Sequence, residues 1–97
     1  MELKGKQKRF LRALGVNLTP VLTIGKEGVS EHTITQADGV LLTRELIKGR
    51  VLPTSPDSPD AVAAQIAVAT HAALVQVVGR NFLLYRPHPE TPQIQLP

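Results

Sequence analysis

The chain has 97 residues, which is enough for one compact domain and too few for two. Hydrophobic residues make up 42% and charged residues 20%, a composition typical of a folded protein and too apolar for a disordered one. The net charge is only +3, and the absence of cysteine excludes a disulfide, a thiolate nucleophile and a zinc site with cysteine ligands.

The first predicted element is a helix over residues 4–14, with Gly15 as its stop. Its apolar side chains recur at helical spacing and are expected to face the core: Leu3, Phe10, Leu11 and Leu14. Lys4, Lys8 and Arg12 are four residues apart and form a row away from Phe10 and Leu14. The helix is therefore predicted to be basic outside and apolar inside.

A short buried strand and a second helix are predicted next. The β-branched run at residues 21–24 favours the strand, which ends at Gly25. Ser30 is typical of a helix N-cap, and we expect this helix to end near Thr43. Gly39 weakens the helix, and its core-facing residues are predicted to be Ile34, Ala37, Val40 and Leu41.

Residues 45–52 are predicted to form the second strand. Side chains alternate between the two faces of a strand, so Lys48 and Arg50 are expected to share one face. Gly49 lies between them and predicts either a bulge or close packing against a neighbour.

A third helix is predicted after the proline-rich loop of residues 53–59. Ser58 followed by Pro59 is a favourable helix start, because proline at the first helical position loses no needed hydrogen bond. The residues expected to face the core are Val62, Ile66 and Ala69. The surface of this helix is rich in alanine, which allows close approach to a sheet.

Two apolar runs at residues 74–78 and 82–85 flank the short segment 79–81 and predict a β-hairpin. Residues 87–97 are predicted to be an extended proline-rich tail, with Ile94 and Leu96 able to pack on the body. The element order is then α-β-α-β-α-β-β. It predicts an α/β fold in one compact domain, with a small mixed four-stranded sheet covered by helices.

No arrangement of residues for catalysis or metal binding is found, so the sequence predicts no enzyme, no metal site and no cofactor. The histidines lie far apart, at His32, His71 and His88, and none has a second histidine or a cysteine at zinc-site spacing. His32 and His88 are expected to be simply exposed. No serine lies in a G-x-S-x-G motif, and the serines occupy cap or loop positions.

Residues 25–28 read G-K-E-G and lie between the first strand and the second helix. Glycines let a ligand approach the backbone closely, and free N–H groups at a helix N-terminus attract phosphate. Lys26 at the tip adds a positive charge. The same G-x-x-G pattern clamps the nucleic-acid backbone in KH domains, and an ordinary strand-to-helix turn is the alternative interpretation.

Charge is distributed unevenly along the chain. Residues 1–12 contain one acidic residue, Glu2, against the basic residues Lys4, Lys6, Lys8, Arg9 and Arg12, whereas residues 51–79 contain no Lys or Arg. A clustered basic face indicates a polyanion partner, and an ordinary solvated helix face explains it equally well. Aromatic residues make up 3%, so nucleic-acid binding would use backbone charge and shape, with limited base readout; Phe10 is expected to be in the core.

Four segments occur in the order found in a known family. They are K-Q-K-R-F-L-R-A-L from Lys6, L-T-P-V-L-T-I-G-K-E-G-V-S from Leu18, R-E-L-I-K from Arg44 and V-Q-V-V-G-R-N-F-L-L-Y-R-P from Val75. Together they resemble the CRM domain in its stand-alone bacterial YhbY-like form. The resemblance implies an RNA-binding domain associated with assembly of the large ribosomal subunit. It also implies a fold similar to the C-terminal domain of bacterial translation initiation factor three.

The resemblance also implies a set of RNA-binding residues. Gly25, Lys26 and Gly28 match the G-x-x-G loop of the family, and the basic residues of the first helix match its basic surface: Lys4, Lys6, Lys8, Arg9 and Arg12. Lys48 and Arg80 are candidate extensions of that surface. The sequence departs from the family pattern at Glu27, Gly39, Gly49 and the loop of residues 53–59.

The predicted function is that of an RNA-binding assembly factor, which contacts the phosphates of precursor large-subunit ribosomal RNA in a pre-ribosomal particle. We expect a cytoplasmic monomer without membrane association, because no apolar run approaches the roughly 18 residues that span a bilayer and the N-terminus has no secretory signal. The alternative is a protein-interaction module that another factor recruits to ribosomes, with apolar surface near residues 62–73 as its contact.

Overall fold

The structure is a computed structural model and describes residues 2–97. The helices and strands are α1 (Gly5–Gly15), β1 (Pro20–Ile24), α2 (Glu31–Arg44), β2 (Leu46–Val51), α3 (Pro59–Thr70), β3 (Ala73–Val78) and β4 (Asn81–Tyr85). This is the predicted order. Among residues 2–97, none of the helices combines the length and apolar character that crossing a bilayer requires.

The four strands form one mixed sheet in the order β1-β2-β4-β3. β1 and β2 are parallel and are joined through α2, while β4 is antiparallel to both β2 and β3. β3 and β4 form the predicted hairpin, and Gly79 in its turn has a φ of +58°, which glycine adopts without strain. The predicted mixed four-stranded α/β fold is confirmed.

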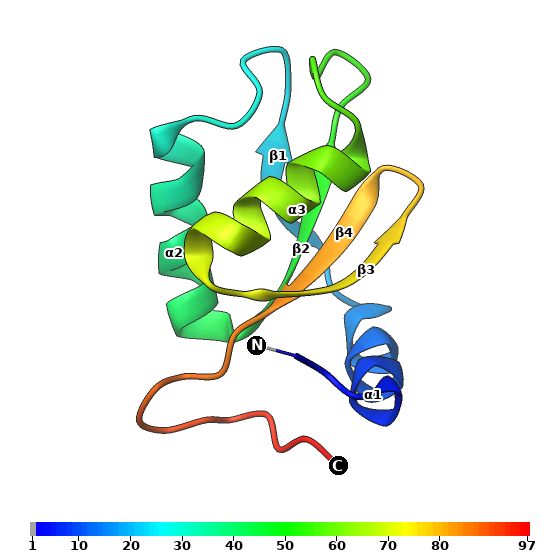
Figure 1. Ribbon diagram of the computed structural model, residues 1–97, viewed down its shortest axis with the longest axis vertical. Coiled ribbons are helices and arrows are strands. Elements are labelled where there is room, and N and C mark those ends of the chain that lie inside the picture. Colours follow the sequence, from blue (N-terminus) through cyan, green and yellow to red (C-terminus); the bar gives the residue numbers. More distant parts are fainter. Residues whose placement is uncertain (1) are drawn as a thin grey trace.

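Helices α2 and α3 cover one face of the sheet (Figure 1). Ser30 and Ser58 cap these helices as predicted, each accepting a hydrogen bond from a backbone N–H three residues later. The core on this face consists of Leu22, Ile24, Ala37, Leu41, Ile47, Val51, Val62, Ala63, Ile66, Ala67, Phe82 and Leu84. Ala69 was predicted to join it but is exposed, because the buried stripe of α3 runs through Ala63 and Ala67 instead.

Gly49 is explained by close packing. The ring of Phe82 from β4 lies directly over it, and a Cβ built at Gly49 would fall 2.6 Å from Cε2 of that ring. Phe82 itself is 1% exposed, so the ring has no free space to move into. The other predicted explanation was a bulge at Gly49. The irregularity in the pairing of β1 with β2 lies instead in β1, between Pro20 and Leu22. The aromatic ring therefore occupies the space that a side chain at Gly49 would need.

Helix α1 and the C-terminal tail lie on the opposite face of the sheet. The second hydrophobic cluster consists of Leu3, Leu11, Leu46, Ala73, Val75, Leu83 and Tyr85, with Leu18, Ile94 and Leu96 packed against it. Gly15 was predicted to stop α1, and the helix ends at this residue, which is buried against Leu83. A Cβ at Gly15 would fall 2.9 Å from Cδ2 of Leu83, so glycine here allows the helix end to approach the sheet.

The apolar stripe of α1 was predicted incorrectly in part. Leu3 and Leu11 are buried, whereas Phe10 and Leu14 are 37% and 43% exposed. Leu11 and Gly15 are the residues of the helix that face the sheet. Phe10 and Leu14 each come one residue earlier, and this position places them on one flank of the helix. Phe10 is therefore not a core residue.

Glu45 anchors the C-terminal tail. Its side chain is buried between the end of α2 and the tail, where Oε2 accepts the backbone N–H of His88 at 2.7 Å. Oε1 accepts the backbone N–H groups of Gln93 at 2.9 Å and Ile94 at 2.8 Å. The backbone φ of Glu45 is +66°, a strained conformation for a residue with a side chain. One carboxylate thus fixes two points of the tail.

The environment of Glu45 determines its ionisation. Burial raises the pKa of the carboxyl, but the backbone N–H donors of His88, Ile94 and Gln93 together lower the pKa below its ordinary value. A lowered folded-state pKa contributes stability that is fully present above the ordinary pKa of glutamate, about 4.3. This stability is lost as the pH falls through the lowered folded-state pKa.

Replacing Glu45 by Gln is expected to destabilise the protein at about pH 7 by roughly 1–3 kcal/mol, because the amide cannot accept at both positions. Urea unfolding at about pH 7 and about pH 3 measures this. We expect the wild-type protein to lose more stability on acidification than Glu45→Gln. Glu90→Gln, at an exposed tail position, is the control. Equal acid sensitivity of the wild type and Glu45→Gln would contradict this role.

Candidate nucleic-acid interface

The helix and strands that form the α1 side of the fold carry basic side chains and no acidic ones. No Asp or Glu occurs in α1 or in any of the four strands. These elements carry Lys6, Lys8, Arg9, Arg12, Lys48 and Arg50. Helices α2 and α3, on the other face, contain Glu31, Asp38 and Asp60 together with one basic residue, Arg44. The face that carries α1 is therefore the positive one.

Lys48 and Arg50 lie on the part of this face that α1 leaves open. They alternate with Ile47 and Val51, which are buried under α2 and α3 on the opposite face. Lys48 is half-buried and Arg50 is exposed. The one ion pair within residues 2–97 joins Arg86 to Asp38, so Lys48 and Arg50 have no carboxylate partner in the described part of the chain.

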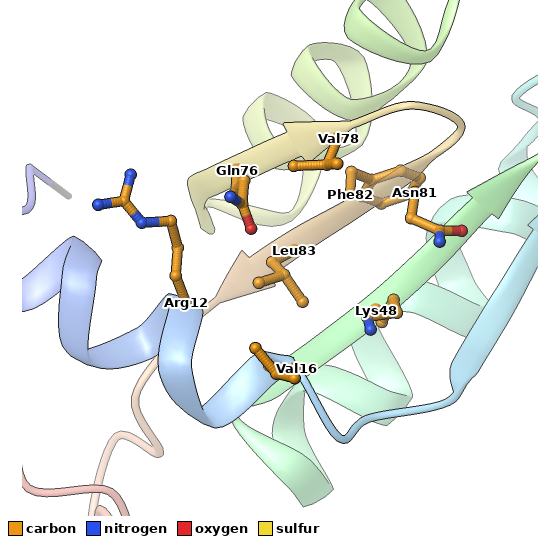
Figure 2. Close-up of a pocket in the computed structure, with 9 residues that line it drawn as sticks. Arg12, Val16, Lys48, Gln76, Val78, Asn81, Phe82 and Leu83 are labelled. Atoms are coloured by element: carbon orange, nitrogen blue, oxygen red, sulfur yellow. The ribbon is translucent and has the colours of Figure 1, made fainter.

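The basic residues of α1 differ in their surroundings. Lys8 and Arg12 are half-buried and project from one flank of the helix, opposite the flank of Phe10 and Leu14. The other predicted residues of this region, Lys4, Lys6 and Arg9, are exposed. Lys4 precedes the helix as its N-cap. Arg12 is the member of this group that lines, together with Lys48, a hollow in the sheet surface, and the two residues lie on opposite sides of it (Figure 2).

The Gly25–Gly28 segment is a tight turn closed on itself. The N–H of Gly28 donates to the carbonyl of Gly25 at 3.0 Å, and Gly28 has a φ of +68°. A Cβ at Gly28 would fall 3.2 Å from Cγ of Pro56, so the turn packs against the loop after β2. Not all of the backbone N–H groups that were predicted to attract phosphate are free, because those of Gly28 and Ser30 donate within the protein. The turn still presents the exposed Lys26.

The structure does not bring all the predicted residues together. Helix α1 and the Gly25–Gly28 turn lie at opposite ends of the longest axis, along which the molecule extends 37 Å (Figure 1). β2 runs between them and carries Lys48 and Arg50. Arg80 in the hairpin turn lies beside the end of β2, where its Nη1 donates to the Val51 carbonyl at 3.4 Å. The candidate interface is therefore a strip across the sheet.

A hollow of about 290 Å³ lies in this strip, and it is the feature that the sequence interpretation missed. Its rim includes Arg12, Val16, Lys48, Gln76, Val78 and Asn81, with Leu83 beneath (Figure 2). Arg50 was also left out of the predicted site, although the alternation of β2 places it beside Lys48. The hollow lies between the end of α1 and the strands β2, β4 and β3. Its residues are far apart in the sequence, and the order of the strands in the sheet brings them together.

The remaining polar clusters are structural. Arg86 donates from Nη1 to the Thr70 carbonyl at 2.8 Å and to Oδ1 of Asp38 at 2.6 Å, which ties β4 to α3 and α2. His88 was predicted to be exposed but is half-buried, with Nδ1 accepting the backbone N–H of Thr91 at 3.0 Å. Within residues 2–97, no group of three or more His, Cys, Asp or Glu side chains could hold a metal ion.

Comparisons with known proteins agree with this architecture. The sequence model of the CRS1/YhbY (CRM) domain matches residues 3–86. The chain is 41% identical to "Probable RNA-binding protein YqeI" of Bacillus subtilis, covering 98% of this chain and 99% of the relative. It is 37% identical to "RNA-binding protein" of Haemophilus influenzae, covering 98% and 95%.

A similar fold has been solved. The solution structure of SAV1595 from Staphylococcus aureus, described as a hypothetical protein and candidate RNA-binding protein, superposes with a TM-score of 0.83. The two chains are 44% identical, and the match covers 99% of this chain and 100% of the other. Both the sequence and the fold thus match over nearly the full length, and the chain belongs to the CRS1/YhbY (CRM) domain family.

Proposed function

We propose that this protein binds RNA directly, through phosphate contacts along the basic strip of α1, β2 and the Gly25–Gly28 turn. The observation that carries the proposal is the position of Lys48 and Arg50 on the open sheet face, in elements that contain no carboxylate. Such a field attracts a polyanion, and each neutralised phosphate releases counterions. The names of the relatives, which describe RNA-binding proteins, support the same function.

The more specific proposal is a cytoplasmic factor that assembles the large ribosomal subunit. It binds precursor ribosomal RNA in a pre-ribosomal particle as a monomer and without a catalytic step. Sedimentation of a cell extract through sucrose gradients at low and high salt tests this. We expect the protein to migrate with large-subunit precursors at low salt and to be released by high salt. Protein that stays at the top of both gradients would refute the ribosomal assignment.

Lys26→Ala is expected to weaken RNA binding and to lower the slope of log affinity against log salt by about one. The fold should be unaffected, because Lys26 is exposed and the turn is closed by the Gly25–Gly28 hydrogen bond. A salt titration of RNA affinity measures the change. Glu27→Ala, at the neighbouring exposed position, is the matched control and should bind RNA more tightly. Unchanged affinity of Lys26→Ala would remove the turn from the interface.

A protein-interaction function is the second candidate, and the surface of α3 favours it. Val68 is 78% exposed, and Ala61, Ala64 and Ala69 beside it are also exposed. In this case Val68→Glu would release the protein from ribosomal fractions while leaving its affinity for purified RNA unchanged. The first proposal predicts that Val68→Glu still sediments with the precursors.

A further inference from the structure

The hollow beside α1 combines three kinds of chemistry. Arg12 and Lys48 place positive charge at its rim. Val16 and Val78, which are 73% and 59% exposed, are apolar side chains left open to solvent. Gln76 and Asn81 add two amides, each of which offers a donor and an acceptor. Charge, apolar surface and amides thus converge within one concave site.

The floor and the size of the hollow restrict what can enter. Leu83 lies beneath it and is 4% exposed, so the floor is apolar. The volume of about 290 Å³ is at the small end of ligand pockets, which hold roughly 300–1,000 Å³. The site is therefore of a size to take one flat ring system.

We propose that this hollow holds one unpaired nucleotide of the bound RNA. The base lies over Leu83 between Val16 and Val78, and the amides of Gln76 and Asn81 hydrogen-bond to its edge. Arg12 and Lys48 bind the phosphates on either side. Glutamine and asparagine amides are established readers of base edges, and single-stranded RNA offers bases that can be splayed out of the stack.

The charge of the surroundings favours a nucleotide over an uncharged ligand. The helix and strands that line the hollow contain no Asp or Glu, and Arg50 lies on the same strand as Lys48. A base in a duplex is stacked and paired, so it cannot enter without being extruded. The proposal rests on RNA binding as the function of the strip, and it adds that the protein prefers single-stranded RNA at this point.

The test compares Gln76→Leu with wild type, using fluorescence anisotropy with short single-stranded homopolymers and a duplex of equal length. Leucine removes the amide and keeps the charge of the strip. We expect Gln76→Leu to bind its preferred homopolymer at least roughly fivefold more weakly, with reduced discrimination between bases. Affinity for the duplex and the salt slope should be unchanged. Gln65→Leu, at an exposed position on α3, is the matched control.

Asn81→Ala, at an exposed strand end, repeats the measurement without altering a half-buried residue. If both variants bind every RNA as tightly as wild type, the hollow takes no base, although RNA binding by the strip would stand. An equal loss on single strand and duplex would also overturn the proposal. Displacement of a homopolymer from wild type, but not from Gln76→Leu, by an oligoglutamate peptide would identify an acidic peptide as the occupant instead. Wild type that binds neither RNA would refute the proposed function itself.

Discussion

Replacing Lys48 and Arg50 together by Glu is expected to reduce RNA affinity at least roughly a hundredfold at moderate salt. Both side chains lie on the open sheet face without a carboxylate partner in the described part of the chain. Reversing them places two negative charges where phosphates would bind, so attraction becomes repulsion. Neither residue is in a hydrophobic cluster, and the fold should persist.

A control variant must show that the loss of RNA affinity depends on where the charge lies and not only on the change in net charge. Arg44→Glu changes the net charge as much as Arg50→Glu does, but Arg44 is exposed at the end of α2. A comparison of the two single variants by RNA titration therefore separates a local contact from a net-charge effect. Arg50→Glu should lose most of its affinity and Arg44→Glu little. Equal losses would show that the strip is not the interface.

Gly49→Ala is expected to destabilise the protein by about 2–3 kcal/mol, because its Cβ would overlap the ring of Phe82. The ring is enclosed in the core formed by α2, α3 and the sheet, so it can move only by shifting its neighbours. Urea unfolding measures the loss. The sign is opposite to that expected from strand propensity, which disfavours glycine.

Gly39→Ala is the control for this substitution. A Cβ at Gly39 meets nothing within 4 Å, so helix propensity alone should stabilise this variant by up to about 1 kcal/mol. Combining Gly49→Ala with Phe82→Leu tests the mechanism, because the smaller side chain relieves the overlap. The double variant should be less destabilised than the sum of the two single variants. Simple additivity would mean that Phe82 is not what excludes a side chain at Gly49.

Most of the fold could be predicted from the sequence because its signals are local. Ser30 and Ser58 mark helix starts by the hydrogen bonds they make three residues away. Gly79 marks the hairpin turn by its positive φ. Such interactions depend on residues that are close together in the sequence, so sequence patterns can predict them.

The errors concern contacts between distant segments. Glu45 is an ordinary polar residue in the sequence, yet its carboxylate binds the backbone N–H of His88, 43 residues later. Phe10 and Leu14 have the spacing of a core stripe, but Leu11 and Gly15 face the sheet. Nothing local indicates which flank of α1 the sheet covers.

The candidate site was predicted only in its parts. Strand alternation was enough to pair Lys48 with Arg50, and it holds in the structure. The distance between α1 and the Gly25–Gly28 turn could not be predicted, because it depends on how the strands are ordered. The hollow also depends on that order, since Gln76 and Lys48 lie on strands separated by β4.

RNA is proposed to bind directly to the sheet face beside α1. An NMR titration of the isotope-labelled protein with single-stranded RNA locates the contact residue by residue. We expect shifts of the backbone amides of Val16, Lys48, Gln76 and Asn81, with the outer face of α3 at Val68 unchanged. Shifts confined to α3, or no shifts at an RNA concentration well above that of the protein, would contradict it.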